Sequence, residues 1–523
     1  MRDSTVPAGC RVPMLFSSYA FLLGFFPVSL TAMALAGHRT NVRIVLILAV
    51  SLFFYGWWDW RYVPLLLGSI AANYVLGGRL QRCVSDGRQQ AANVVLTVGI
   101  VFDLLVLGVF KYLHFVLGNI DALTGADWTI THLVLPLGIS FWTFEQISYL
   151  VDLRRGARYQ RDLLRYALFV LFFPRLVAGP ILRFGEIEPQ LRRRETGAIL
   201  PDLAVGLSIF AIGLAKKACL ADGIAPYVGA GFAGAIQAPG PDLFAAWGAA
   251  LAYTCQLYFD FSGYSDMAIG AARCFGIRFP ANFNSPYKAS NIVEFWRRWH
   301  MTLSRFLRDY LYIPLGGNRR GPVRRYANLM ITMLLGGLWH GAAWTFVIWG
   351  GLHGVYLMVN HGWAALCRPS ERPIARLIAS AMTFVAVVVG WVFFRSVSVA
   401  AAWHMLRGMI GLNGAAIPEA VFVHLGVLQS GLQALGVVAD GNEGGWSFVS
   451  LWGWIAGLLA LAWLAPNTQQ IMIMAQPTLE AVNAPPRFLS WAPRPGWGLA
   501  VGVAAALGFL SVTRGSVFLY WQF

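Results

Sequence analysis

Apolar stretches recur along almost the whole chain and are separated by short polar segments. A helix needs about 20 apolar residues to cross the hydrocarbon core of a bilayer, because it rises about 1.5 Å per residue. The pattern predicts spanning or deeply inserted helices near residues 15–36, 42–59, 62–78, 92–118, 132–152, 163–182, 202–221, 243–272, 326–350, 351–366, 374–395, 449–465 and 497–513. The pattern thus predicts thirteen segments, give or take two or three.

Glycine, proline or charged residues interrupt several of these segments, which predicts that some helices are broken or re-entrant. Backbone that is not helical is tolerated at membrane depth only where protein or a water-filled cavity covers it. The interruptions therefore predict an internal cavity. The fold class that follows is an all-α polytopic membrane protein. Residues 1–13 precede Met14 and are predicted to be an extension, and residues 14–523 are predicted to form a single membrane domain.

Composition agrees with the apolar pattern. The chain has 523 residues, of which 57% are hydrophobic and 12% are charged. A soluble protein carries about 25% charged residues, so a soluble multidomain protein is excluded. No pair of cysteines has the spacing of metal ligands, so we expect neither a zinc site nor a disulfide framework. The cysteines are Cys10, Cys83, Cys219, Cys255, Cys274 and Cys367.

The net charge of +16 is confined to a few polar segments. Residues 112–153, 218–272 and 408–486 contain no Lys or Arg, whereas residues 273–325 contain eleven. Cytoplasmic loops of membrane proteins are enriched in Lys and Arg, so this distribution predicts a multi-pass protein of the bacterial inner membrane. We expect the positive charge to contact anionic lipid head groups, and we expect no nucleic-acid partner.

An amphipathic stretch over residues 291–317 is too charged to span lipid. At helical spacing Phe295, Trp299, Leu303 and Phe306 share one side, which predicts a helix at the cytoplasmic interface. His300 falls inside the aromatic cluster of this helix. A lone histidine in such a place is more often structural than functional.

A second histidine, His340, lies in the apolar, glycine-rich run of residues 334–354, next to Trp339. An ionisable side chain at membrane depth is costly and usually functional. An unperturbed imidazole, with a pKa of about 6.5, can accept and return a proton near neutral pH. Spacing alone leaves a packing role and a functional role equally open. His353 would lie about 140° away on a continuous helix, which favours a structural role for it.

Two carboxylates, Asp260 and Asp266, interrupt the apolar run of residues 243–272, together with Tyr258 and Tyr264. They would lie about 240° apart on a helix, so they do not form a catalytic pair on one face. Buried carboxylates need hydrogen-bond partners. We favour a structural network that shapes the cavity over direct catalysis, and we interpret Glu145 and the Lys216–Lys217 pair in the same way.

The paired patterns FWRRWHMTLS (295–304) and GLWHGAAWTFVIWGGLHG (337–354) resemble the signature of the membrane-bound O-acyltransferase superfamily, and more narrowly its alginate O-acetyltransferase branch. Four further segments resemble that branch in the same order, so the similarity extends over nearly the whole chain. They are MLFSSYAFLLGFFP (14–27), FFPRLVAGPILRF (172–184), YFDFSGYSDMAIGAARCFGIRFPANFNSPY (258–287) and FLYWQF (518–523).

The resemblance implies a ring of tilted transmembrane and re-entrant helices around a cavity that pierces the membrane. The catalytic core would cover about residues 132–396, with peripheral helices over about residues 397–523. His340 would be the essential histidine and His300 the second polar residue of the active site. The resemblance also implies acetyl-CoA as a cytoplasmic donor with no bound cofactor, a polysaccharide such as alginate or cellulose as acceptor, and periplasmic acetyltransferase partners.

Transfer of an acyl group to a hydroxyl needs a base and hydrogen-bond donors for the developing oxyanion. His340 can be the base, whereas Trp296, Trp339, Asn291 and His300 remain alternative donors, with Trp299 beside them in the cavity wall. D-alanyl transfer to teichoic acid, peptidoglycan acetylation and acylation of a lipid or protein remain alternatives within the superfamily. A multi-span transporter is the alternative from another class.

Overall fold

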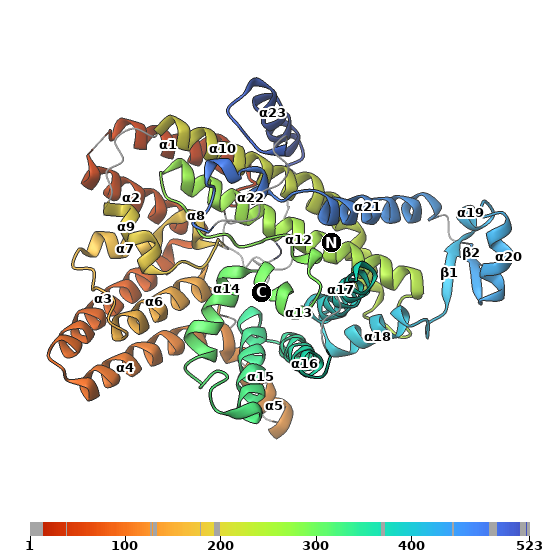
Figure 1. The fold of residues 1–523 in the computed structure, drawn as a ribbon, viewed down its shortest axis with the longest axis horizontal. Coiled ribbons are helices and arrows are strands. Elements are labelled where there is room, and N and C mark those ends of the chain that lie inside the picture. Colours follow the sequence, from red (N-terminus) through yellow and green to blue (C-terminus); the bar gives the residue numbers. More distant parts are fainter. Residues whose placement is uncertain are drawn as a thin grey trace. The chain divides into compact units, whose positions relative to one another are not determined.

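The computed structural model describes residues 14–37, 39–125, 128, 133–177, 179–192, 199–367, 372–441, 444–480, 489–512 and 519. Helices dominate this part of the chain (Figure 1), which agrees with the predicted all-α class. The chain divides into two compact units. Unit 1 comprises residues 1–214, 264–282 and 468–522, and unit 2 comprises residues 215–263 and 283–467. The predicted extension, residues 1–13, lies outside the described residues, and the single domain over residues 14–523 stays a prediction.

Unit 1 is built mainly from the helices of the amino-terminal part of the chain, in which α4 packs against α3 and α6. Its buried carboxylate Glu145 forms an ion pair with the buried guanidinium of Arg175, so this polar pair is internal to the unit. The helices are α1 (Phe26–Leu35), α2 (Thr40–Asp59), α3 (Val63–Ser85), α4 (Gln89–Leu107), α5 (Leu113–Thr124), α6 (Ile139–Arg154), α7 (Leu163–Leu171), α8 (Phe173–Leu176), α9 (Phe184–Arg192), α10 (Ile199–Ala215), α22 (Thr468–Ile471) and α23 (Pro495–Leu510).

Unit 2 contains the two histidine patterns. The 32-residue helix α12 (Leu243–Cys274) contributes its first part to this unit and its last part to unit 1. The other helices of unit 2 are α11 (Asp222–Gly234), α13 (Ile292–Arg298), α14 (Met301–Leu307), α15 (Gly321–His340), α16 (Trp344–Leu366), α17 (Pro373–Arg395), α18 (Val399–Met409), α19 (Glu419–Phe422), α20 (Val427–Ala434) and α21 (Gly445–Leu464).

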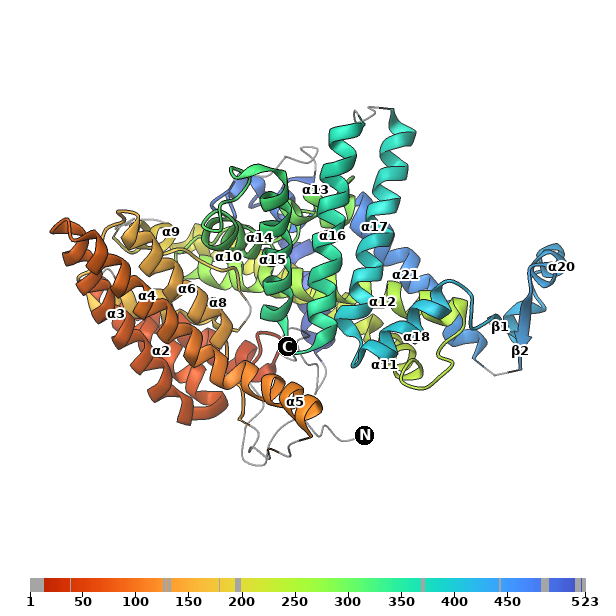
Figure 2. The same ribbon diagram turned by 90° about the horizontal axis from the view of Figure 1, so that it is seen from below.

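Glycines allow α15 and α16 to lie side by side, and α17 lies next to α16 (Figure 2). A Cβ atom on Gly337 would clash with the carbonyl oxygen of Phe346, and one on Gly350 would clash with the carbonyl oxygen of Met333. The two backbones therefore touch at these positions, as small residues permit in membrane helices. This close pair of helices fixes the place of His340, which is the last residue of α15.

Five helical stretches in the described part of the chain are long and apolar enough to cross a membrane. They are Thr40–Ser85, Gln89–Thr124, Leu200–Gly234, Pro373–Arg395 and Gly445–Leu464, and the shorter Ala20–Leu35 and Pro495–Leu510 are also apolar. Thr40–Ser85 contains both α2 and α3, which match the predicted segments 42–59 and 62–78 and are separated by the turn at Trp60–Tyr62. How many of the thirteen predicted segments cross or enter the membrane stays a prediction. The ring around a membrane-piercing cavity stays a prediction.

Two predicted helix boundaries are wrong, and both lie beside a histidine. The expected segments 326–350 and 351–366 are separated at residues 341–343, where Gly341 and Ala343 are extended. The expected continuous helix over 291–317 is interrupted at Trp299 and His300. Apolar periodicity runs through both points, so it gave no sign of either break.

The described residues also contain a small two-stranded parallel sheet. Strand β1 (Ala415–Pro418) pairs with β2 (Val437–Asp440) in the register Ala415 to Val437. Ile417, Phe422 and Val437 form a small buried cluster beneath these strands. The sheet belongs to the predicted peripheral part of the chain and supplies none of the candidate site residues.

Candidate active site

His340 lies at the end of a helix and inside a cage of aromatic rings. Its side chain is buried, with 4% exposure. The ring centroids of Trp339, Trp349 and Phe394 lie 4.9, 5.1 and 5.2 Å from that of His340. The carboxyl end of a helix carries partial negative charge, which stabilises a cation there by about 0.3–1 kcal/mol. The position of His340 therefore favours an imidazole that gains a proton during a reaction.

His300 lies at the break between α13 and α14, in an unusual backbone conformation. Its φ is 43° and its ψ is 52°, a left-handed region that few residues other than glycine adopt. The side chain is fully buried, and its ring lies 4.8 Å from that of Phe261 on α12. The break turns the chain at His300, and the ring lies among aromatic side chains.

The two histidines belong to one cluster. Their ring centroids are 6.4 Å apart, and the ring of Trp339 lies 6.2 Å from His300. Since His300 and His340 are 40 positions apart in the sequence, only the fold brings them together. The spacing of the two patterns did not predict this distance, although the resemblance implied that both residues belong to one site.

His353 is a buried residue with a hydrogen-bond partner, and its predicted structural role stays a prediction. The indole Nε1 of Trp296 donates a hydrogen bond to Nδ1 of His353 over 3.3 Å. Its ring lies 4.8 Å from that of Trp349, which also contacts His340. The angular separation predicted between His340 and His353 assumed a continuous helix, and the break at residues 341–343 removes that assumption.

The hydrogen bond from Trp296 also fixes the protonation of the His353 ring. A neutral imidazole has one nitrogen that accepts and one that carries a hydrogen. Because Nδ1 accepts from Trp296, Nε2 of His353 carries the hydrogen. Trp296 is thereby held by a polar partner, which limits its use as a free donor toward a substrate.

Trp299 packs into an aromatic wall next to the two histidines. Its ring lies 4.9 Å from that of Trp391 on α17 and 5.0 Å from that of Phe283. Tyr258 lies in the same unit, with its ring 5.2 Å from that of Tyr287, and Tyr287 lies 6.2 Å from Trp299. The wall is continuous from Tyr258 to Trp299, so these two predicted residues are linked by packing.

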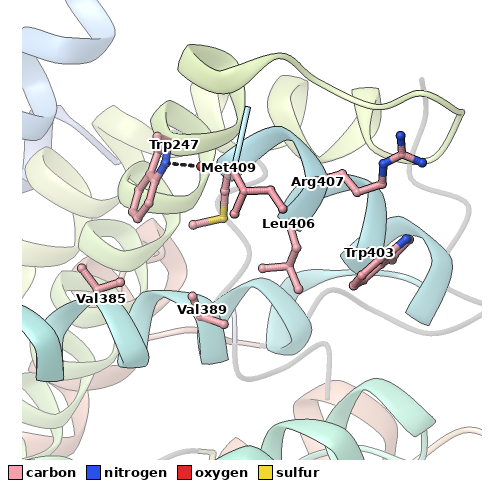
Figure 3. Close-up of a pocket in the computed structure, with 8 residues that line it drawn as sticks. Trp247, Val385, Val389, Trp403, Leu406, Arg407 and Met409 are labelled. Atoms are coloured by element: carbon pink, nitrogen blue, oxygen red, sulfur yellow. Dashed lines mark hydrogen bonds between the residues drawn. The ribbon is translucent and has the colours of Figure 1, made fainter. Parts of the chain in front are cut away.

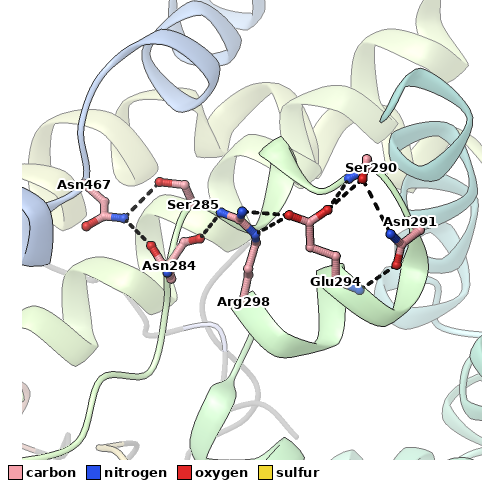
Figure 4. A network of polar contacts seen from close by, with 7 residues as sticks. All are labelled: Asn284, Ser285, Ser290, Asn291, Glu294, Arg298 and Asn467. Carbon is pink, nitrogen blue, oxygen red and sulfur yellow. Dashed lines mark hydrogen bonds and ion pairs between the residues drawn. The ribbon is translucent and has the colours of Figure 1, made fainter. Parts of the chain in front are cut away.

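Asn291 has a structural task at the start of α13 (Figure 4). Its side-chain oxygen accepts a hydrogen bond from the backbone N–H of Glu294 over 2.9 Å. The Glu294 carboxylate accepts from the backbone and hydroxyl of Ser290 and forms a 2.7 Å ion pair with Arg298. Arg298 in turn donates to the carbonyl of Asn284. Asn291 thus caps a helix, and its role as an oxyanion donor stays a prediction.

The charge of Glu294 is stabilised by this network. Burial alone would raise the pKa of the Glu294 carboxyl, but the hydrogen bonds from Ser290 and Arg298 and the charge of Arg298 together lower that pKa below its ordinary value. The carboxylate therefore stays ionised near neutral pH and holds Arg298 against the turn at residue 284.

Asp260 forms a buried ion pair, as the structural interpretation anticipated. The ammonium of Lys217 lies 2.7 Å from Asp260 and 2.6 Å from Asp222. Lys217 belongs to a π-helical turn over Lys216–Ala221, and such turns place a side chain off the regular helical face. The pair joins this turn to α12 inside unit 2.

Tyr264 and Asp266 belong to unit 1. Tyr264 stacks on Phe16 with 4.7 Å between ring centroids, and the carboxylate of Asp266 accepts hydrogen bonds from Thr468 and Gln469. Asp260 and Asp266 therefore have different partners, which agrees with the prediction that they do not form a carboxylate pair. Whether Tyr264 and Asp266 line the predicted cavity stays a prediction.

The cluster of unit 2 offers the groups that proton transfer needs. His340 can take a proton at a helix end, and His300 supplies a second polar group in the same apolar surroundings. Interactions between charges are stronger in such a dry, aromatic environment than in water. The arrangement suits a reaction in which a hydroxyl loses a proton while negative charge develops on a neighbouring oxygen.

Comparisons with known proteins agree with this chemistry. The sequence model of the membrane-bound O-acyltransferase family matches residues 124–403, more than half of the chain. A peptidoglycan O-acetyltransferase of Helicobacter pylori is 40% identical over 434 residues, which cover 77% of this chain and 81% of that protein. A probable alginate O-acetylase of Azotobacter vinelandii is 44% identical over 406 residues, which cover 76% and 79%. A teichoic acid D-alanyltransferase of Streptococcus thermophilus is 31% identical over 238 residues, which cover 43% and 57%.

Proposed function

The chain belongs to the membrane-bound O-acyltransferase family and is a membrane O-acyltransferase, and on that premise we propose that it transfers acetyl groups across the membrane toward the hydroxyls of a polysaccharide. The observation that supports this proposal most directly is the burial of His340 and His300 in one aromatic cluster, 6.4 Å apart. The donor is acetyl-CoA, used as a substrate. A transporter is set aside because the family is one of O-acyltransferases.

The chemical step follows from the two imidazoles. His340 removes the proton of the acceptor hydroxyl as that oxygen attacks the carbonyl carbon of the thioester. The new C–O ester bond forms, the C–S bond breaks, and the proton on His340 passes to the leaving thiolate. His300 donates a hydrogen bond to the carbonyl oxygen while it carries negative charge. The aromatic rings around both residues exclude water that would otherwise hydrolyse the thioester.

The distribution of charge supports a cytoplasmic donor. The eleven Lys and Arg of residues 273–325 include Arg297 and Arg308, whose side chains are exposed. Such side chains bind phosphate groups like those of acetyl-CoA. The same residues mark the cytoplasmic side of an inner-membrane protein. The acceptor then approaches from the periplasm, where a partner acetyltransferase completes transfer to the polymer.

The acceptor is the least constrained part of the proposal. Similarity to the alginate O-acetylase and to the peptidoglycan O-acetyltransferase extends over about three quarters of this chain, and both of those names describe O-acetylation of a glycan. Similarity to the D-alanyltransferase covers less than half of it. Acetylation of an exopolysaccharide such as alginate or cellulose is therefore favoured over D-alanyl transfer, and peptidoglycan is the second candidate acceptor.

Labelled acetyl-CoA tests the proposal. Inverted inner-membrane vesicles that contain the chain and its periplasmic partners should transfer label into an alkali-sensitive ester on polysaccharide. Vesicles of the opposite orientation should transfer none unless they are permeabilised. Enzymatic digestion of the product with glycan-specific lyases or with lysozyme then separates an exopolysaccharide from peptidoglycan. Label that enters only lipid or protein would contradict the proposal.

A further inference from the structure

An apolar pocket of about 300 Å³ lies between α12, α17 and α18, and its lining includes neither His300 nor His340 (Figure 3). This volume is at the lower end of the range for small-ligand sites, about 300–1,000 Å³. Its floor is formed by Val385 and Val389 of α17 and by Leu406 and Met409 of α18. The indole Nε1 of Trp247 donates to the carbonyl of Met409 over 2.9 Å, so α12 closes one wall of the pocket.

The pocket borders a helix that is apolar enough to cross a membrane, Pro373–Arg395. At its rim Trp403 is 59% exposed and Ile410 is 70% exposed. Exposed apolar side chains next to a membrane-spanning helix face acyl chains, and tryptophan is enriched where acyl chains meet head groups. A lipid can therefore enter the pocket past Trp403 and Ile410, with its acyl chain directed toward the apolar floor.

One cation, Arg407, completes the pocket. Its guanidinium is directed away from Leu406, Val389 and Trp403 (Figure 3). Its Nε atom is buried and has no hydrogen-bond partner among the described residues. A buried guanidinium nitrogen without a partner is costly. The guanidinium also forms no ion pair with a carboxylate among the described residues. Its outer nitrogens are therefore available to phosphate, which guanidinium groups bind with strong, charge-assisted hydrogen bonds.

We propose that this pocket binds one anionic glycerophospholipid, with an acyl chain on the Val385, Val389 and Leu406 surface and the phosphate at Arg407. An apolar floor with a cation at its mouth complements the two ends of such a lipid. The bound lipid would stabilise the packing of α18 against α17. This site is separate from the chemistry of acetyl transfer, so it stands whether or not the proposed acceptor is correct.

The test measures lipid retained by the purified full chain. Wild type and variants are reconstituted in nanodiscs of equal parts phosphatidylglycerol and phosphatidylcholine, extracted into detergent, and washed. Phospholipid per protein is then measured by mass spectrometry. We expect wild type to retain phosphatidylglycerol in preference to phosphatidylcholine. Arg407→Gln should lower that retention about tenfold, since it removes one charge-assisted hydrogen-bond site.

Val389→Trp should abolish retention by filling the floor, whereas Arg376→Gln, which removes an exposed cation of the same helix, should leave it unchanged. Retention unchanged in both Arg407→Gln and Val389→Trp would overturn the proposal. Equal retention of the two lipids by wild type would also overturn it, because a pocket that holds any amphiphile does not need Arg407. Thermal unfolding of each variant, monitored in the same detergent, separates loss of the lipid from loss of the fold.

Discussion

The backbone of His300 constrains which residues can replace it. A left-handed conformation is strained for most side chains, and asparagine tolerates it better than alanine. His300 also sits in an apolar cluster, where its ring centroid lies 6.4 Å from that of His340. Both the left-handed backbone and the need for a hydrogen-bond donor therefore favour a polar residue such as asparagine over alanine at this position.

We predict that His300→Asn retains more activity and more stability than His300→Ala. Asparagine keeps a hydrogen-bond donor and fits the left-handed backbone, whereas alanine supplies neither. Loss of one oxyanion donor typically lowers kcat by about 100- to 1,000-fold, which is the loss expected for His300→Ala. Rates of acetyl transfer and midpoints of thermal unfolding, measured on both variants, check this. Equal activity in the two variants would remove His300 from the chemical step.

The histidine patterns could be found in the sequence, but their geometry could not. Both lie in runs whose apolar periodicity continues through the breaks at His300 and at residues 341–343, so hydrophobic spacing alone gave continuous helices. The ion pairs of Asp260 with Lys217 and of Glu145 with Arg175 join residues 43 and 30 positions apart, which no local pattern encodes. Only the need of each buried charge for a partner was predictable.

At the scale of elements, the contact between α15 and α16 positions His340. Gly350 faces the backbone of α15. A Cβ atom on Gly350 would lie 3.2 Å from the Cα of Gly337 and would clash with the carbonyl oxygen of Met333. At the neighbouring Gly351, an added Cβ atom would lie 3.5 Å from the side chain of Leu334, which is an ordinary van der Waals contact. These adjacent positions form a matched pair for testing the contact.

We predict that Gly350→Ala destabilises the protein by about 1–3 kcal/mol, because overpacking pushes the two helices apart. The same displacement moves His340 and lowers acetyl transfer. Gly351→Ala should be neutral or slightly stabilising, since alanine favours helix more than glycine does. Unfolding in detergent and activity in vesicles measure both effects. Similar behaviour of the two variants would show that the helices are not held by backbone contact at Gly350.

The start of α13 should respond to pH through Glu294. A carboxyl whose pKa is lowered in the folded state contributes stability at pH values above its unfolded pKa, which is about 4.3, and loses that contribution as pH falls through the folded pKa. Wild type should therefore exceed Glu294→Gln in Tm at pH 7, and the difference should shrink as pH falls below about 4.3. A difference in Tm that is constant from pH 7 to pH 3 would rule out ionisation of Glu294 as its cause.

At the scale of the whole molecule, the distribution of charge predicts which segments face each side of the membrane. The basic segment of residues 273–325 should face the cytoplasm, and residues 408–486, which lack Lys and Arg, should expose their polar parts to the periplasm. Arg297 and Ser430 are exposed representatives of the two segments.

Cysteine labelling checks this topology. In a variant without reactive native cysteines, Ser430→Cys should react with a membrane-impermeant maleimide added to intact spheroplasts. Arg297→Cys should react only after the membrane is permeabilised. Labelling of Arg297→Cys in intact spheroplasts would place the basic segment outside the cytoplasm and would remove the argument for a cytoplasmic donor.

The central claim is that His340 accepts the proton of the attacking hydroxyl. Acetyl ester formed on polysaccharide is measured with His340→Gln and with His424→Gln, which replaces an exposed histidine of the same unit. With equal amounts of folded protein in the membrane, His340→Gln should lower the rate by about 100- to 10,000-fold, as expected for loss of a general base, and His424→Gln should match wild type. A His340→Gln variant that forms ester at the wild-type rate would contradict the account.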